Sequence, residues 1–183
     1  MIKKISPILL ISLFLILLLS CSFNPNEELQ NIGLNRLADL KLYNTTYKVV
    51  NDDSPPIVIE AKKIEIYKKE KKVIITEAVF NQYEKENKHL MSGSFGLGEI
   101  DTDTNEMKLS DGVILNHLEE QLSIISDYLY WDNKNQIVSG TDENRVKLIN
   151  KEHDIIIGRG FKGDFSSATF EFQFLEEGVL VYD

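Results

Sequence analysis

The sequence predicts an all-β protein, an elongated antiparallel β-jelly roll, from three observations. A unit of two strands recurs three times between residues 64 and 148. From residue 57 to residue 182, apolar and polar residues alternate with a period of two, as is typical of antiparallel strands with one face in water. Turn-forming residues recur at a spacing of about ten, which suits a sandwich, a jelly roll or an open β-solenoid.

The first element, residues 1–20, is a signal peptide rather than part of this fold. Lys3 and Lys4 form a positive start, and residues 7–19 form an almost wholly apolar run. This run is too short to span a bilayer comfortably. Cys21, the only cysteine, stands where a bacterial lipobox places the lipid-bearing residue, so we expect a lipid anchor there and no internal disulfide. An uncleaved signal anchor or an unlipidated secreted protein is the alternative.

A tether and a short helix are expected over residues 21–56. The apolar residues of segment 27–43 recur close to the 3.6-residue period of a helix, at Leu29, Ile32, Leu37 and Leu40. A loop at residues 52–56 contains two aspartates and two prolines and is expected to separate the tether from the body. The rest of the chain, residues 57–183, is then one β-domain with a short N-terminal extension.

The expected mature chain is acidic, with 18 basic and 29 acidic residues once Lys3 and Lys4 are removed. A field of this sign disfavours nucleic acid as a partner and does not attract anionic bilayers. Membrane attachment therefore depends on the lipid. One predicted hairpin is crowded with lysines that could meet an anionic headgroup or an acidic partner, although a solvated turn explains them as well: Lys62, Lys63, Lys68, Lys69, Lys71 and Lys72.

Each copy of the repeated unit places two strands around a charged turn. The copies are EIYKKEKKVIITEAVF from Glu65, EIDTDTNEMKLSDGVIL from Glu99 and YLYWDNKNQIVSGTDENRVKL from Tyr128. The residue that opens the turn precedes an apolar strand residue by six positions, in the pairs Tyr67 with Val73, Asp101 with Met107 and Trp131 with Ile137. The closing valine follows six positions later in the first two copies and nine later in the third, which predicts a longer third turn.

The sequence patterns that could carry chemistry do not fit their surroundings. Segment 158–163 has the glycine spacing of a dinucleotide site, but the alternating residues after it predict a strand instead of the required helix. Asp101, Asp103 and Asn105 have the spacing of the first three ligands of an EF-hand calcium loop. Glu106, however, stands where that loop needs glycine. The three histidines are scattered, and no nucleophile stands beside a base. We therefore expect no enzyme activity, no metal and no cofactor.

Several short motifs together resemble the LptC family, the periplasmic component of the lipopolysaccharide export bridge. They lie in LSIISDYLYWDNKNQIVSGTDENRVKLI and IIIGRGFKGDFSSATFEF. The family pattern joins an L-x-W element, an I-x-S strand, a V-x-L strand and a G-x-G-F segment followed by an acid, matched here at residues 129–131, 137–139, 146–148 and 158–161 and at Asp164. The resemblance covers residues 57–175 and implies a V-shaped or folded jelly roll. The best-known members carry an N-terminal transmembrane helix, whereas this chain has a lipobox.

The resemblance implies a carrier that receives lipopolysaccharide or another amphipathic glycolipid from an inner-membrane ABC transporter and passes it along a β-groove. Its partners would be the membrane subunits of the transporter and an LptA-like periplasmic protein, joined by edge-strand addition. Gly158, Gly160 and Asp164 would be the family motif at that partner edge. The chain would be periplasmic, with its lipid anchor in the inner membrane; another membrane leaflet is the alternative.

The alternation of the strands predicts which residues point into the groove. They are Ile64, Ile66, Val73, Ile75, Val79, Met107, Leu109, Val113, Leu115, Leu129, Trp131, Ile137, Val146, Leu148 and Phe161. The same stripe would also fill a closed sandwich core. A structural or surface-exposed lipoprotein that binds another protein through a closed β-sandwich is therefore the competing prediction.

Overall fold

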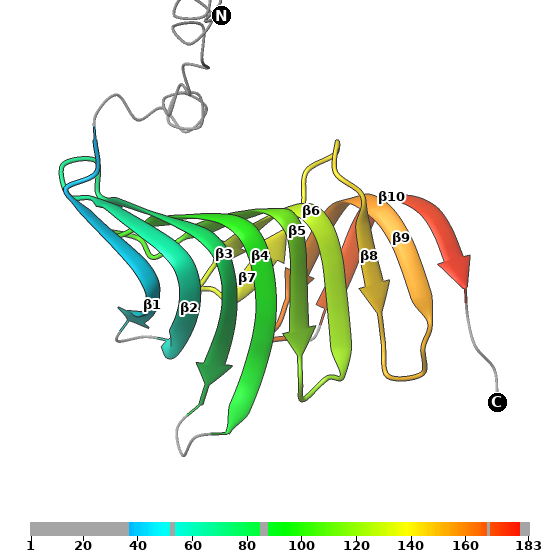
Figure 1. Cartoon of the computed structure of the whole chain (residues 1–183). Helices are drawn as coiled ribbons and strands as arrows, with labels where there is room; N and C mark the ends of the chain where they lie inside the picture. The colour runs from blue at the N-terminus through cyan, green and yellow to red at the C-terminus, as the bar shows by residue number, and fades with distance from the viewer. Residues whose placement is uncertain (1–36, 52–53, 85–87, 168, 180–183) are drawn as a thin grey trace, which may run out of the picture. The chain divides into compact units, whose positions relative to one another are not determined.

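The computed structural model describes residues 37–51, 54–84, 88–167 and 169–179, and in these ranges the chain is all β (Figure 1). Ten antiparallel strands form one sheet. Their bounds are β1 Leu40–Asn51, β2 Ser54–Tyr67, β3 Lys72–Tyr83, β4 His89–Asp101, β5 Met107–His117, β6 Leu122–Asp132, β7 Ile137–Ser139, β8 Val146–Ile149, β9 Ile155–Asp164 and β10 Thr169–Val179. The fold class expected from the sequence, an antiparallel β-jelly roll, is confirmed.

The strands follow one another across the sheet in nearly the order of the sequence. β1 to β6 are joined by successive hairpins, β7 and β8 both lie between β6 and β9, and β10 pairs with β9. Among the described strands, β1 and β10 are therefore the two edges of the sheet. Each long strand between these two edges is paired on both sides along most of its length, which satisfies its backbone polar groups.

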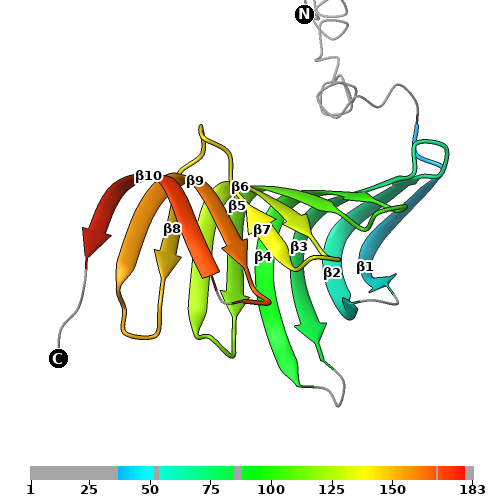
Figure 2. The same ribbon diagram turned by 180° about the vertical axis from the view of Figure 1, so that it is seen from behind.

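The long strands bend along a line that we call the crease, at residues 44, 62, 77, 96, 111–112 and 127. Residues at this line drop out of the pairing register: Thr76 pairs with Leu97 and Ala78 with Phe95, while the residues between them do not pair. Three of the strands carry a left-handed residue there, at Asn44 (φ 48°), Glu77 (φ 48°) and Asp111 (φ 66°). In β7 and β8 the strand is interrupted completely, by residues 140–145. The bend lets one sheet form two layers (Figures 1 and 2).

The two ends of the strands face each other across the interior, because the sheet folds over at the crease. We call one end lip A, which consists of the turns at residues 68–71, 102–106, 133–136 and 165–167. The other end, lip B, consists of residues 82–84, 88–91, 117–121 and 150–154. Figure 2 shows β7 and the start of β10, which belong to the lip A half, in front of β4 to β6. The apolar core lies between these layers.

The N-terminal part of the sheet differs from the sequence prediction. The helix expected over residues 27–43 is wrong in its described part, because Leu40–Tyr43 belongs to β1 and pairs with Ile64–Ile66 and Lys63 of β2. Leu37 and Leu40 are 73% and 44% exposed, so their helix-like spacing does not mark a buried face. The sheet thus begins at Leu40, and β2 begins at Ser54 inside the loop that was expected to precede the body. Residues 1–36, including Cys21, lie outside the described residues.

The three repeated units are the first three of the four hairpins with turns in lip A. Their turns place left-handed residues at equivalent positions, Lys71, Asn105 and Gln136. The prediction of a longer third turn is wrong. Its turn at residues 133–136 is as short as that at residues 68–71, and the extra residues lie between β7 and β8 at the crease.

Candidate functional site

The interior between the two layers is the candidate lipid site, and most of the predicted groove residues point into it. Twelve of the fifteen are buried: Ile64, Val73, Ile75, Met107, Leu109, Val113, Leu115, Leu129, Trp131, Val146, Leu148 and Phe161. Ile66 is partly buried and packs against them. Their contact with lipid stays a prediction, since burial shows only that they face inward.

Val79 is an exception, because it points outward and is 49% exposed. Counting alternate residues from Val73 and Ile75 places Val79 inside. The left-handed Glu77 interrupts that alternation at the crease, so the inward residues after it are Ala78 and Phe80. A one-residue change of phase moves every later side chain of the strand to the other face.

Ile137 is the second exception, because its neighbour Val138 occupies the inward position. Val138 is 0% exposed, whereas Ile137 is only half-buried. The register explains the difference: Trp131 pairs with Val138, as Ile100 pairs with Met107 and Ile66 with Val73. Val138 is therefore the residue of the third copy that corresponds to Val73 in the first. The sequence alignment of the third copy, which used Ile137, was shifted by one residue.

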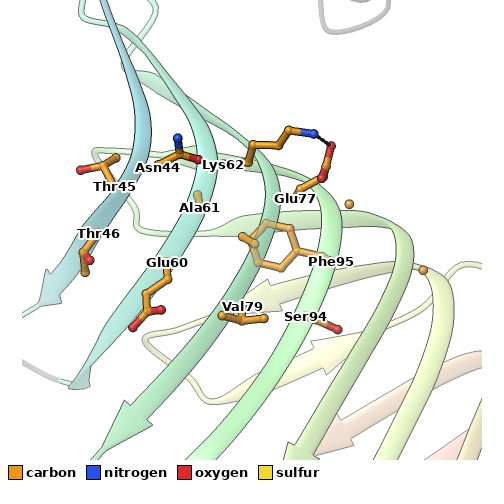
Figure 3. A pocket seen from close by; sticks show the side chains of 13 residues that line it. Asn44, Thr45, Thr46, Glu60, Ala61, Lys62, Glu77, Val79, Ser94 and Phe95 are labelled. Atoms are coloured by element: carbon orange, nitrogen blue, oxygen red, sulfur yellow. Dashed lines mark hydrogen bonds and ion pairs between the residues drawn. The ribbon is translucent and has the colours of Figure 1, made fainter.

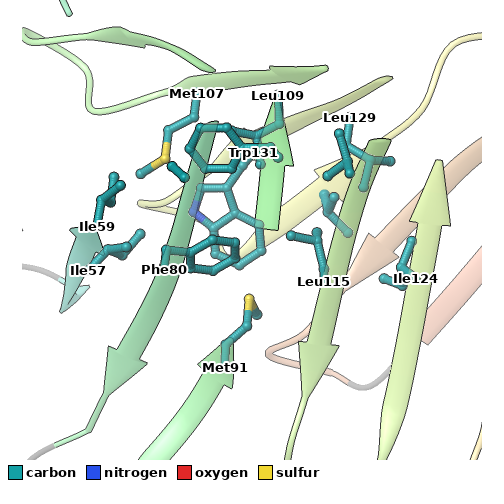
Figure 4. Close-up of a cluster of buried hydrophobic side chains, with 14 of the residues drawn as sticks. Ile57, Ile59, Phe80, Met91, Met107, Leu109, Leu115, Ile124, Leu129 and Trp131 are labelled. Carbon is teal, nitrogen blue, oxygen red and sulfur yellow. The ribbon is translucent and has the colours of Figure 1, made fainter. Parts of the chain in front are cut away.

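The interior is filled with side chains at its centre (Figure 4). A cavity of about 10 Å³ lies there, which is no larger than the space that one water molecule needs. It is lined by Ile57, Ile59, Phe80, Met91, Phe95, Met107, Leu109, Leu115 and Trp131. At this point the layers form a packed core rather than an open trough. Five of these nine residues were not predicted, because they belong to β2, β3 and β4 beyond the change of phase at the crease.

Side chains join lip A to lip B at two places, which we call the seam. The Gln82 side-chain nitrogen donates to Oδ1 of Asn133 at 3.4 Å and to the backbone oxygen of Pro55 at 3.1 Å. Asn133 Oδ1 also accepts from Trp131 Nε1 at 3.3 Å. Further along, the His117 ring stacks on Phe165, with centroids 5.0 Å apart and planes 6° from parallel. These contacts close the side of the interior that lies opposite the crease.

His117 is a buried titratable group at the seam. Burial lowers the pKa of its imidazole, although the carboxylates of Glu120, Glu119 and Glu84 oppose this shift and Lys88 supports it. Its Nδ1 accepts a hydrogen bond from the backbone nitrogen of Glu120 at 3.2 Å, which the neutral ring can do and the protonated ring cannot.

We expect His117 to make stability depend on pH in the mildly acidic range. Because its pKa is lower in the folded state, its contribution is complete above the unfolded pKa of about 6.5 and is lost as the pH falls below that value. Replacing His117 with Phe keeps a ring against Phe165. It should make the free energy of unfolding depend less steeply on pH between about pH 7 and pH 5. Urea unfolding at several pH values measures this. An unchanged slope would contradict the shift.

A second hollow, of about 620 Å³, lies on the outer surface along the crease (Figure 3). Its lining is mostly polar or small and includes Val79, which explains where that side chain points. Lys62 and Glu77 form an ion pair of 2.7 Å at its border, and both are exposed. Solvent screens such a pair, so it contributes little to stability. The hollow is wide and open to solvent, unlike the packed interior.

The glycines of the G-x-G-x-x-G segment have a structural role in β9. A Cβ on Gly158 would lie 2.4 Å from the backbone oxygen of Phe174, and Gly160 has a φ of +62°. Asp164 ends the strand and accepts hydrogen bonds from the backbone nitrogens of Ser166, at 2.9 Å, and Ser167, at 3.2 Å. The assignment of these residues to a partner edge is wrong, because β9 is paired on both sides.

Most of the lysines in the basic hairpin have acidic partners. Glu65 is buried and contacts Lys41 at 2.7 Å and Lys63 at 3.1 Å. Burial raises the pKa of its carboxyl, but the two ammonium groups outweigh burial and the net shift is downward. Lys71 pairs with Asp103, and Lys72 with Glu99. This hairpin is therefore a solvated, ion-paired edge of lip A rather than a free basic patch.

Comparison with known proteins adds a family to this geometry. Residues 8–173 match the family model described as lipopolysaccharide-assembly, LptC-related. The chain belongs to the LptC family. Members of the LptC family take part in lipopolysaccharide transport as periplasmic components of the cell envelope, and they bind lipopolysaccharide and partners in the export machinery. A search of the curated proteins gives no match.

The LptC match confirms the resemblance inferred from residues 57–175 and extends it into the apolar N-terminal run. LptC proteins are components of the transport bridge. The described residues contain no helix that is long and apolar enough to cross a membrane.

Proposed function

We propose that this LptC-family chain is a periplasmic carrier in a lipopolysaccharide or glycolipid export bridge. It receives lipid from an inner-membrane ABC transporter and passes it along the interior of the folded sheet. The observation that carries the proposal is the continuous apolar interior from β2 to β9, combined with the family match. Each methylene group that an acyl chain buries there contributes about 0.8 kcal/mol, so several chains bind firmly without a covalent bond.

The two free edges of the sheet support a place within a chain of similar proteins. β1 and β10 are long and pair on one side only among the described strands, so each offers backbone groups to an added strand. Both also expose large apolar side chains, at Tyr43 and Val50 of β1 and at Phe174 and Leu175 of β10. An LptA-like periplasmic protein and the membrane subunits of the transporter would add to these edges, continuing the apolar path from one protein to the next.

The N-terminal region would hold the carrier at the membrane. Under this proposal residues 1–20 are removed, Cys21 carries the lipid, and the inner membrane is its most suitable location beside the transporter. The short segment up to Leu40 would then link the anchor to the sheet.

The small size of the central cavity favours a second function. The centre of the interior has a free volume of only about 10 Å³. A sandwich packed in this way could serve as a structural or surface-exposed lipoprotein that binds another protein through its outer faces. The two functions differ in one respect that can be measured: only the carrier must admit acyl chains between its layers.

Co-purification of lipid distinguishes the two functions. The full chain is purified from membranes in mild detergent, and bound glycolipid is extracted and quantified by mass spectrometry. We expect glycolipid in amounts comparable to the protein, and a large loss in Leu115→Trp, which fills the interior. The matched control is Ile114→Trp on the outer face of the same strand, where the residue is 38% exposed. A compact chain without glycolipid would instead support the protein-binding lipoprotein.

A further inference from the structure

The seam differs from every other junction in the sheet because side chains alone hold it together. Elsewhere neighbouring strands share backbone hydrogen bonds, as β4 and β5 do from Met91 with His117 to Ile100 with Met107. Among the described residues, no strand pairing and no backbone hydrogen bond joins lip A to lip B. The contacts across the seam include Gln82 with Asn133 and His117 with Phe165, and the first of these is a long hydrogen bond of 3.4 Å.

The seam also holds a polar atom that lacks a hydrogen-bond partner among the described residues. Gln82 is 0% exposed, and its side-chain oxygen accepts no hydrogen bond. A buried acceptor without a donor is costly, and such a group in a native fold calls for an explanation. A hydroxyl or amide group of a ligand that reached this point would supply the missing donor. Glycolipids carry many such groups next to their acyl chains.

While the lips are closed, a route through the ends of the sheet would be harder for an acyl chain. From β1 or β10 it would have to displace one packed side chain after another, because the interior holds only about 10 Å³ of free space at its centre. Parting the lips breaks no strand pairing and exposes the apolar residues of both layers together. The crease, with its unpaired and left-handed residues, is the line about which the layers would separate.

We propose that the seam is the lateral entry for acyl chains, which pass between Gln82 and Asn133 and between His117 and Phe165. This inference rests on the proposed carrier function and adds to it the place and the motion of entry. In the closed state the two layers pack on each other, and in the lipid-bound state acyl chains take the place of part of that packing. The polar head stays at the seam, beside the amide groups of Gln82 and Asn133.

A disulfide across the seam tests this directly. In the full chain with Cys21→Ser, which removes the only native thiol, Gln82→Cys is combined with Asn133→Cys, and in a second variant His117→Cys with Phe165→Cys. The matched control joins two adjacent strands without crossing the seam, through Asn116→Cys and Ser123→Cys, whose parent side chains lie 2.7 Å apart. Each pair is closed by oxidation or by a short bis-methanethiosulfonate linker, and closure is read from gel mobility.

The probe is a lipid with two diazirine-bearing palmitoyl chains in phosphatidylcholine vesicles. After illumination, labelled peptides are identified by mass spectrometry. We expect a seam disulfide to reduce labelling of interior residues by about tenfold or more, since it removes the state that can bind, and reduction to restore it. The control disulfide should leave labelling unchanged.

The outcomes separate this inference from the carrier function itself. If a chain with a closed seam is still labelled inside as strongly as the reduced chain, lipid enters from the ends and the lateral entry is wrong, while the carrier function stands. If no variant is labelled inside, whether oxidised or reduced, the carrier function fails and the lateral entry fails with it. A thermal melt of each variant shows that the comparison is made on folded protein.

Discussion

Replacing Val113 with Asp is expected to unfold the sheet. Val113 is 0% exposed, and it lies in β5 next to the crease, between β4 and β6. A carboxylate placed there has no cationic partner and must either stay ionised without water or take up a proton. Buried carboxyls of this kind have pKa values several units above normal, which corresponds to a loss on the order of 5 kcal/mol at neutral pH. A loss of this size approaches the entire stability of a typical domain, about 5–15 kcal/mol.

The adjacent residue provides the control for this prediction. Ile114→Asp introduces the same charge one position later, on the outer face, where the side chain is 38% exposed and the carboxylate can reach water. We expect its cost to stay within about 1 kcal/mol. Urea unfolding of both variants, followed by circular dichroism, makes the comparison. Similar losses in the two would show that residues 113 and 114 do not face opposite sides of the sheet.

The hairpin turns could be predicted from the sequence because their signals are local. Asp101 accepts hydrogen bonds from the backbone nitrogens of Asp103, at 2.9 Å, and Thr104, at 3.0 Å, as an aspartate commonly does at the start of a turn. Asp132 accepts one from the nitrogen of Asn135 in the same way. A residue type and its neighbours suffice to mark such a turn. The repeat, the strand alternation and the fold class all follow from these local features.

In β3 the crease could not be predicted, because the residue type at that position does not mark it. At Glu77 the strand adopts a left-handed backbone that glycine or asparagine would have indicated, but glutamate does not. Val79 was therefore assigned to the wrong face. In the third copy, residues 140–145 at the crease resemble turn residues, so the extra length was assigned to the turn instead.

The seam lies beyond sequence reasoning for a different reason. Gln82 and Asn133 are 51 positions apart, and neither is apolar. His117 and Phe165 meet only because the crease brings lip A against lip B. Pairing between residues on non-adjacent strands depends on the angle of the bend, and a single sequence carries no pattern that encodes this angle.

Replacing Gly93 with Ala is expected to destabilise the sheet by about 1–3 kcal/mol, although alanine is normally the better residue in a strand. A Cβ at this position would lie 2.2 Å from the backbone oxygen of Ile114 and 2.5 Å from a ring carbon of Phe80. Gly93 pairs with both Phe80 and Leu115, so the ring of Phe80 covers a gap that a side chain would otherwise fill. The carbonyl of Ile114 belongs to β5 and cannot move without disturbing its strand pairing.

Gly178→Ala is the matched control, because a Cβ there meets nothing within 4 Å. At an unstrained site the same change reduces the entropy of the unfolded chain and stabilises by about 0.4–1 kcal/mol, so the two substitutions should differ in sign. Thermal unfolding of each variant measures this difference, and equal effects would contradict it.

A double variant separates the two contacts at Gly93. Phe80→Leu removes the ring but leaves the backbone oxygen of Ile114 in place, so adding it to Gly93→Ala should recover only part of the loss. Full recovery would mean that the side chain of Phe80 alone excludes alanine. Partial recovery would mean that the close approach of β4 and β5 also excludes alanine at position 93. In that case the Ile114 oxygen would still lie too near the new Cβ after the ring of Phe80 has been removed.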